Sequence, residues 1–160
     1  KITILDPNML NTLWEHKIDK EYSKLLKLIY SLVSNDDTTS TDVLIAYTEI
    51  ERIKDSIDDI GEKFLKRVFT EREIEYCESK KAQHYAGRFA AKEAAFKAVS
   101  AELDDKYSVC WTDFEVVDDM QGRPHLHIYN INTEKIANID VSISHCKLYA
   151  TANVVALYKD

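Results

Sequence analysis

An alanine-rich segment in the middle of the chain constrains the fold more than any other feature. Residues 80–101, with AGRFAAKEAAFKAV at their centre, have the strongest helix preference in the sequence. Their alanines would let another element pack close to the helix. Glu93 and Lys97 are four residues apart and share one helix face, flanked by Arg88 and Lys92. The pattern fits either a solvated, ion-paired face or a functional site.

Strand-like segments on both sides of this helix predict an α+β fold. A β-branched and aromatic run at residues 42–50 predicts a strand, and helical spacing follows over residues 51–69. Thr70 and Glu73 form a capping box that opens a short helix. After the central helix come FEVVDD, the turn MQGRP, HLHIYNI, IDVSISH and YATANVVALY. Because hairpin turns join these strands, we expect a mainly antiparallel sheet packed on the long helix.

The chain divides into three parts in this interpretation. Residues 1–33 carry apolar side chains at helical spacing and predict an amphipathic helical extension. Residues 34–41 contain no apolar side chain and predict a polar linker, and residues 42–160 form the main domain. The extension is either a packing or linker helix or a helix that docks a partner.

Composition excludes several classes of protein. The chain has 21 Lys and Arg against 28 Asp and Glu, a net charge of −7, so we do not expect nucleic-acid binding. No apolar run is long enough to span a membrane, and no signal peptide precedes Asp6 and Pro7. The three separated cysteines fit neither a disulfide framework nor a zinc site, so a cytoplasmic location is expected. The first residue is Lys1 rather than Met, which is compatible with a segment of a longer protein.

Histidines near the C-terminus are further candidates for a site. His145 ends an alternating strand and could bind a ligand or serve as a capping or core residue. His125 and His127 resemble half of a metal site, but no third ligand has matching spacing, so we expect surface residues. Cys146 follows His145 directly, and neighbouring strand residues point to opposite faces, so a catalytic pair is not expected. The sequence contains no GxxxxGK[ST], GxGxxG, GxSxG or HExxH motif.

Five sequence motifs in a fixed order indicate a resemblance to a known family. They are EIERI, FLKRVFTEREIEYC, AGRFAAKEAAFKA, QGRPHL and VSISHCKLYATANVVA. Together they resemble the holo-acyl-carrier-protein synthase family, the small bacterial type of 4′-phosphopantetheinyl transferase, over residues 42–160. The resemblance implies transfer of 4′-phosphopantetheine from coenzyme A to a serine of an acyl or peptidyl carrier protein, in fatty acid or polyketide biosynthesis. It also implies dependence on Mg²⁺ and a homotrimer whose sites are shared between neighbouring subunits.

The resemblance assigns roles to particular residues of this chain. Glu93 matches the metal-binding glutamate, Lys97 the lysine beside the pyrophosphate, and His145 the histidine at the phosphates; these three are the implied catalytic residues. The implied contacts to coenzyme A come from Arg88, Lys92, Lys97, Ser144 and His145. Arg52 and Arg67 match residues that dock the acidic carrier protein.

Three departures from the family pattern affect the metal, the nucleotide and the partner. Ala46 stands where the family has its second metal ligand, an aspartate; Thr48 is a poor substitute, and Asp42 is about 13 Å away along the strand. VSAELDDKYS replaces a glycine-rich turn, and the acidic helix DSIDDIGEK would repel an acidic partner. The sequence therefore leaves two hypotheses: a working transferase with a depleted metal site, or a non-catalytic domain for oligomerisation or carrier docking in a larger synthase.

Overall fold

The computed structural model describes residues 41–100, residue 103 and residues 108–159. The predicted helical extension at residues 1–33 lies outside the described residues. The predicted linker lies outside them too, except for Thr41, which opens the first strand.

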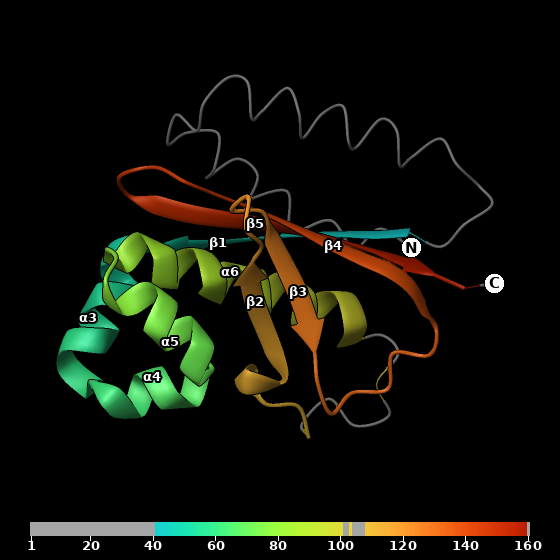
Figure 1. Cartoon of the computed structure of the whole chain (residues 1–160), viewed down its shortest axis with the longest axis horizontal. Coiled ribbons are helices and arrows are strands. Elements are labelled where there is room, and N and C mark those ends of the chain that lie inside the picture. Colours follow the sequence, from blue (N-terminus) through green and yellow to red (C-terminus); the bar gives the residue numbers. More distant parts are fainter. Residues whose placement is uncertain (1–40, 101–102, 104–107, 160) are drawn as a thin grey trace.

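The described residues form an α+β domain, as predicted (Figure 1). In chain order the elements are β1 (Thr41–Glu49), α3 (Ile50–Ile60), α4 (Glu62–Val68), α5 (Glu71–Glu78), α6 (Ala82–Val99), the 3₁₀ helix η2 (Trp111–Asp113), β2 (Phe114–Asp118), β3 (Pro124–Ile128), β4 (Ile136–His145) and β5 (Tyr149–Tyr158).

The helical segments before α6 differ from the sequence prediction at one point. Residues 51–69 do not form one helix, because Gly61 adopts φ 68°, ends α3 and precedes α4. Glycine reaches positive φ without steric cost, so it is the natural residue for this break. The capping box of α5 is confirmed: Glu73 N donates to Thr70 Oγ1 at 3.4 Å, and Thr70 N donates to Glu73 Oε2 at 2.9 Å.

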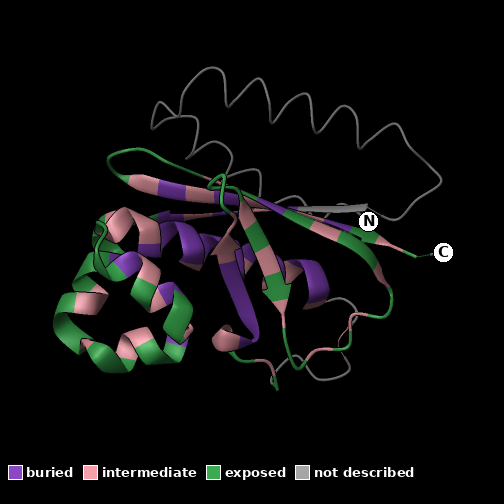
Figure 2. Ribbon diagram, viewed as in Figure 1, coloured by how far each residue is buried: buried purple, intermediate pink, exposed green. Residues whose placement is uncertain are grey.

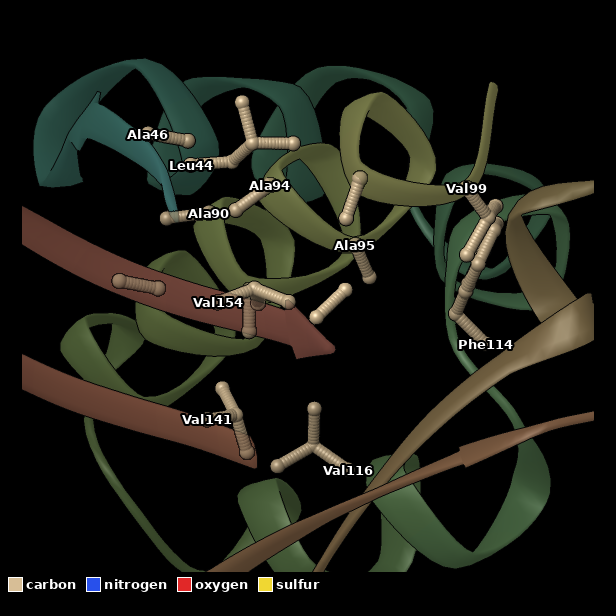
Figure 3. Packing of buried hydrophobic residues seen from close by; sticks show 14 residues of the cluster. Leu44, Ala46, Ala90, Ala94, Ala95, Val99, Phe114, Val116, Val141 and Val154 are labelled. Carbon is tan, nitrogen blue, oxygen red and sulfur yellow. The ribbon is translucent and has the colours of Figure 1, made fainter. Parts of the chain in front are cut away.

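The antiparallel pairing is confirmed, and the strands divide between two sheets. One sheet has the order β1-β5-β4, and β2 and β3 form a separate hairpin. Helix α6 packs on the inner face of the three-stranded sheet, and most of its residues are buried (Figure 2). Ala46 and Val154 of the sheet lie in one apolar cluster with Ala90 and Ala94 of α6 (Figure 3). The alanines predicted to permit close packing do so.

Gly87 allows helix α6 to pack closely against strand β4. A Cβ atom placed at Gly87 would lie 2.8 Å from Ile143 Cγ2, closer than packed carbon atoms approach. We expect Gly87→Ala to destabilise the protein by about 1–2 kcal/mol, because overpacking outweighs the better helix preference of alanine. Urea unfolding checks this value. The same substitution in an Ile143→Ala background should cost less, and an equal cost in both backgrounds would contradict the assigned contact.

Candidate functional site

Helix α6 presents one accessible ion pair. Glu93 Oε1 lies 2.8 Å from Lys97 Nζ, and the two side chains remain 32% and 37% exposed. The four-residue spacing predicted this shared face, and the geometry agrees. A carboxylate and an ammonium group that are both reachable from solvent can bind a cation and a phosphate side by side.

Arg88 lies inside the protein rather than on a solvated face. Its Nη2 atom is 3.2 Å from Asp118 Oδ2, and its side chain is 5% exposed. Its Cζ atom is 3.9 Å from the centroid of the Tyr76 ring. Its Nε atom is buried and has no hydrogen-bond partner in the described part of the chain. Arg88 therefore has one donor that no described residue uses, although this donor is shielded from solvent.

Lys92 is fully buried, and its Nζ atom already has three partners. It lies 2.6 Å from Glu73 Oε2 and donates to Val68 O at 2.7 Å and to Trp111 O at 3.2 Å. The pKa of Lys92 lies below its ordinary value, because the effect of burial exceeds the opposing effect of the Glu73 carboxylate. An ammonium group has three donors. A phosphate could approach the Lys92 nitrogen only by displacing one of these partners, so the geometry supplies no open contact to coenzyme A at Lys92.

Ser144 and His145 lie exposed at the end of β4. They pair with Thr151 and Ala150 in the β4–β5 hairpin. The predicted alternation is present, with Val141 facing inward and Ser144 outward. Strand termini at a sheet edge are common positions for ligand-binding side chains.

Aromatic rings connect His145 to the first turns of α6. The His145 ring lies 5.8 Å from the ring of His84, and the His84 ring lies 6.1 Å from the ring of Tyr76. Lys80 Nζ and Arg88 Cζ lie 3.6 Å and 3.9 Å from the centroid of the same Tyr76 ring. These contacts place His145 in one group with Arg88. The sequence patterns did not single out Tyr76 or His84, and the one available signal was the four-residue spacing of His84 and Arg88.

The candidate residues thus form two groups along α6. His84 precedes Glu93 by nine positions, which corresponds to about 13 Å of helix rise. Arg88 and His145 belong to the first group, and Glu93 and Lys97 to the second. A ligand bound by both groups must be extended, or the two groups must serve sites shared with another subunit.

The two predicted docking arginines lie on a surface of mixed charge. Arg52 on α3 and Arg67 on α4 are both exposed. The acidic side chains of α3, Asp55, Asp58 and Asp59, are exposed as well. The same helices carry the surface ion pairs of Lys54 with Glu51 and of Lys66 with Glu62.

The metal-binding side chains of the site suit a metal ion that is also bound by the phosphate groups of a substrate. Ala46 is 1% exposed in the apolar core and offers no ligand atom. Residues 41–100, 103 and 108–159 contain no group of three or more His, Cys, Asp or Glu that could hold a metal ion. Mg²⁺ usually binds one or two carboxylates together with substrate phosphates and water. Glu93 fits that description, as the one carboxylate of a site that the pyrophosphate and water would complete.

His125 and His127 lie on the surface, as predicted. His125 Nε2 lies 3.1 Å from Asp119 Oδ2, and the His127 ring stacks on Tyr129.

All three cysteines are free, and burial raises the pKa of the Cys77 thiol to about 11, so this thiol is a poor nucleophile. Within the described ranges, no helix is long and apolar enough to cross a membrane.

Comparison with known proteins defines the class. A sequence model of the 4′-phosphopantetheinyl transferase superfamily matches residues 48–155, and the chain belongs to this superfamily. It is 44% identical over 111 residues to the holo-[acyl-carrier-protein] synthase of Protochlamydia amoebophila, covering 67% of this chain and 89% of the relative. It is 42% identical over 115 residues to that of Ruminiclostridium cellulolyticum, covering 67% and 84%.

Solved structures agree with this assignment. The holo-(acyl-carrier-protein) synthase of Bacillus anthracis in complex with CoA (3′,5′-ADP) is 35% identical, with a TM-score of 0.59, and the match covers 73% of this chain and 96% of that one. The Helicobacter pylori holo-[acyl-carrier-protein] synthase in complex with coenzyme A is 27% identical, with a TM-score of 0.61, covering 71% and 98%. The five motifs imply the fold of the holo-acyl-carrier-protein synthase (AcpS) family, and these structures confirm an AcpS-like fold.

Proposed function

We propose that this chain transfers 4′-phosphopantetheine from coenzyme A to a serine of an acyl or peptidyl carrier protein. The observation that carries this proposal is the accessible Glu93–Lys97 pair on α6, in a chain 44% identical to a holo-[acyl-carrier-protein] synthase. Two similar structures are described as complexes with coenzyme A or its 3′,5′-ADP portion, which supports coenzyme A as the co-substrate. Free cysteines fit a cytoplasmic enzyme.

The reaction requires charge neutralisation more than covalent chemistry by the protein. The carrier serine oxygen forms a bond to the pantetheine-side phosphorus, the bond to the bridging oxygen breaks, and adenosine 3′,5′-bisphosphate leaves. The serine proton goes to solvent. Lys97, which is partly exposed, can neutralise the pyrophosphate as negative charge develops on the leaving oxygen. The buried Nε atom of Arg88 has no acceptor among the described residues, and Ser144 and His145 are exposed at the end of β4. These three residues would orient the remaining phosphate oxygens.

The proposed metal dependence follows from Glu93. A Mg²⁺ ion carried by the pyrophosphate would neutralise its charge, and Glu93 would hold that ion in the site. Glu93 pairs with Lys97 in the free protein, so the two side chains would separate to meet ion and phosphate.

We also infer a homotrimer with sites shared between subunits, and docking of the carrier through Arg52 and Arg67. The separation of the two residue groups along α6 supports shared sites, because His84, which contacts His145, precedes Glu93 by about 13 Å of helix rise. The two exposed arginines offer contacts to an acidic carrier. Light scattering tests the assembly, and a monomer at micromolar concentration would contradict it.

The nucleotide product offers a direct test of the reaction. Adenosine 3′,5′-bisphosphate should accumulate when the protein, coenzyme A and Mg²⁺ are incubated with an apo carrier protein, and not when the carrier is omitted. Chromatography of the nucleotides measures this product. Absence of product with several different carriers would contradict the proposal.

Ala46 favours a second candidate function, a non-catalytic domain that assembles or docks a carrier protein within a larger synthase. An alanine lacks the metal-binding carboxylate that the resemblance expects on β1. The Ala46 side chain is instead packed in the apolar core. The two candidates differ in what they expect of coenzyme A: the transferase binds and cleaves it, and the assembly module does neither.

Restoring a carboxylate at position 46 should strengthen metal binding. We expect Ala46→Asp to lower the Mg²⁺ concentration that gives half-maximal transfer by about tenfold, because a second carboxylate would join Glu93. Because position 46 is buried, we also expect the variant to melt at a lower temperature than the wild type when Mg²⁺ is absent. A Mg²⁺ titration of the initial rate measures this change. Ala46→Asn has similar volume without the charge and serves as the control. Equal Mg²⁺ requirements for both variants and the wild type would show that position 46 does not reach the metal.

A further inference from the structure

His84 lies between two aromatic rings that belong to different elements. It is half-buried on α6, four residues before Arg88. Its ring meets the Tyr76 ring of α5 at 6.1 Å and 68°, and the His145 ring of β4 at 5.8 Å and 63°. Both contacts have edge-to-face geometry, which aromatic pairs prefer. His84 therefore joins α5, α6 and the end of β4 at one point.

The charges around His84 favour its neutral form. Burial lowers the pKa of His84, and so do the nearby Lys80, His145 and Arg88, while Asp118 raises it. The pKa of His84 therefore lies below the ordinary value of a histidine, which favours the uncharged ring. A neutral ring can pack against a second imidazole without charge repulsion.

His145 depends on such a contact because its position is otherwise open. The residue is exposed, it ends β4, and Cys146, Lys147 and Leu148 after it are exposed as well. The His84 ring is the one aromatic contact of His145 within the described residues. An exposed imidazole held by one ring loses its fixed orientation when that ring is removed.

We propose that His84 is a positioning residue, whose ring fixes the orientation of the His145 imidazole so that His145 can meet a phosphate of coenzyme A. The inference rests on the proposed function, in which His145 is a phosphate-binding residue. His84 itself need not touch the substrate.

Three variants test this role. His84→Ala removes the ring and should raise KM for coenzyme A by about three- to tenfold, with a much smaller effect on kcat, because a single aromatic contact is lost. His84→Phe retains an edge-to-face ring and should restore KM to within about twofold of wild type. His127→Ala removes an exposed histidine on β3, outside the site, and should leave both constants unchanged. Steady-state kinetics with varied coenzyme A supply the values.

A second measurement uses the wild-type protein and so does not require that any variant folds. Nuclear Overhauser effects should be observed between the ring protons of His84 and His145. Their absence would overturn the proposal. So would an unchanged KM in His84→Ala, or equal impairment of His84→Phe and His84→Ala; in these cases wild-type transfer would leave the proposed function standing. A wild-type protein that neither binds nor cleaves coenzyme A would overturn the proposed function and this inference with it.

Discussion

Lys92→Met is expected to destabilise the protein by about 3–5 kcal/mol. The substitution removes the ammonium group and leaves the Glu73 carboxylate buried without its cation, and breaking a buried ion pair from one side has a cost of this size. It also leaves the carbonyl groups of Val68 and Trp111 without the donor that Lys92 supplies. Urea unfolding followed by circular dichroism gives the change in the free energy of unfolding.

A matched surface pair provides the control for Lys92. Lys66 lies 2.7 Å from Glu62 at an exposed position of α4, so Lys66→Met removes an ion pair of similar length that water screens. The control should unfold at nearly the wild-type urea concentration. Adding Glu73→Gln to Lys92→Met should recover part of the loss, because glutamine removes the unpaired charge and keeps an acceptor for Val116 N. Equal effects at Lys92 and Lys66 would contradict the role of the buried pair.

Glu93→Ala is expected to reduce phosphopantetheine transfer by about 10²–10³-fold or more. The substitution removes the one carboxylate proposed to hold the metal ion and releases Lys97 from its partner. Because the Glu93 side chain is 32% exposed, its loss should hardly change the melting temperature. Initial rates of carrier modification, with a thermal melt of each preparation, separate the two effects.

Glu62→Ala is the matched control for Glu93. Each glutamate pairs with a lysine four residues later in its helix, at 2.7 Å for Glu62 and 2.8 Å for Glu93. Glu62 lies on α4 rather than α6, and its side chain is 77% exposed. Glu62→Ala should retain wild-type transfer. Wild-type turnover of Glu93→Ala would mean that the site is placed wrongly on α6.

The sequence predicted the local structure well where local physics determines it. The Thr70–Glu73 capping box, the alternation in β4 and the alanine face of α6 all depend on side chains a few residues apart. The break at Gly61 was missed, because the apolar spacing of residues 51–69 continues through this glycine and does not reveal its positive φ. The division of the strands into two sheets depends on packing across the molecule, and the strand pattern contains no information on it.

The sequence patterns also predicted only those features of the site that depend on residues close together in the chain. The Glu93–Lys97 pair follows from helix periodicity, whereas Arg88 and Lys92 are buried by partners distant in the sequence, Asp118 and Glu73. A charged residue in a helix pattern gives no sign of such partners. His84 was missed for this reason too, since its neighbour His145 lies on β4.

The most direct test of the proposed transferase is the intact mass of an apo carrier protein incubated with this chain, coenzyme A and Mg²⁺. We predict a gain of one phosphopantetheine group, on the carrier's serine, that disappears when Mg²⁺ is removed by a chelator. Such a gain would mean that the site works without a carboxylate at Ala46. An unchanged carrier mass with several carriers, together with no binding of coenzyme A in a calorimetric titration, would contradict the transferase and leave a domain used for assembly.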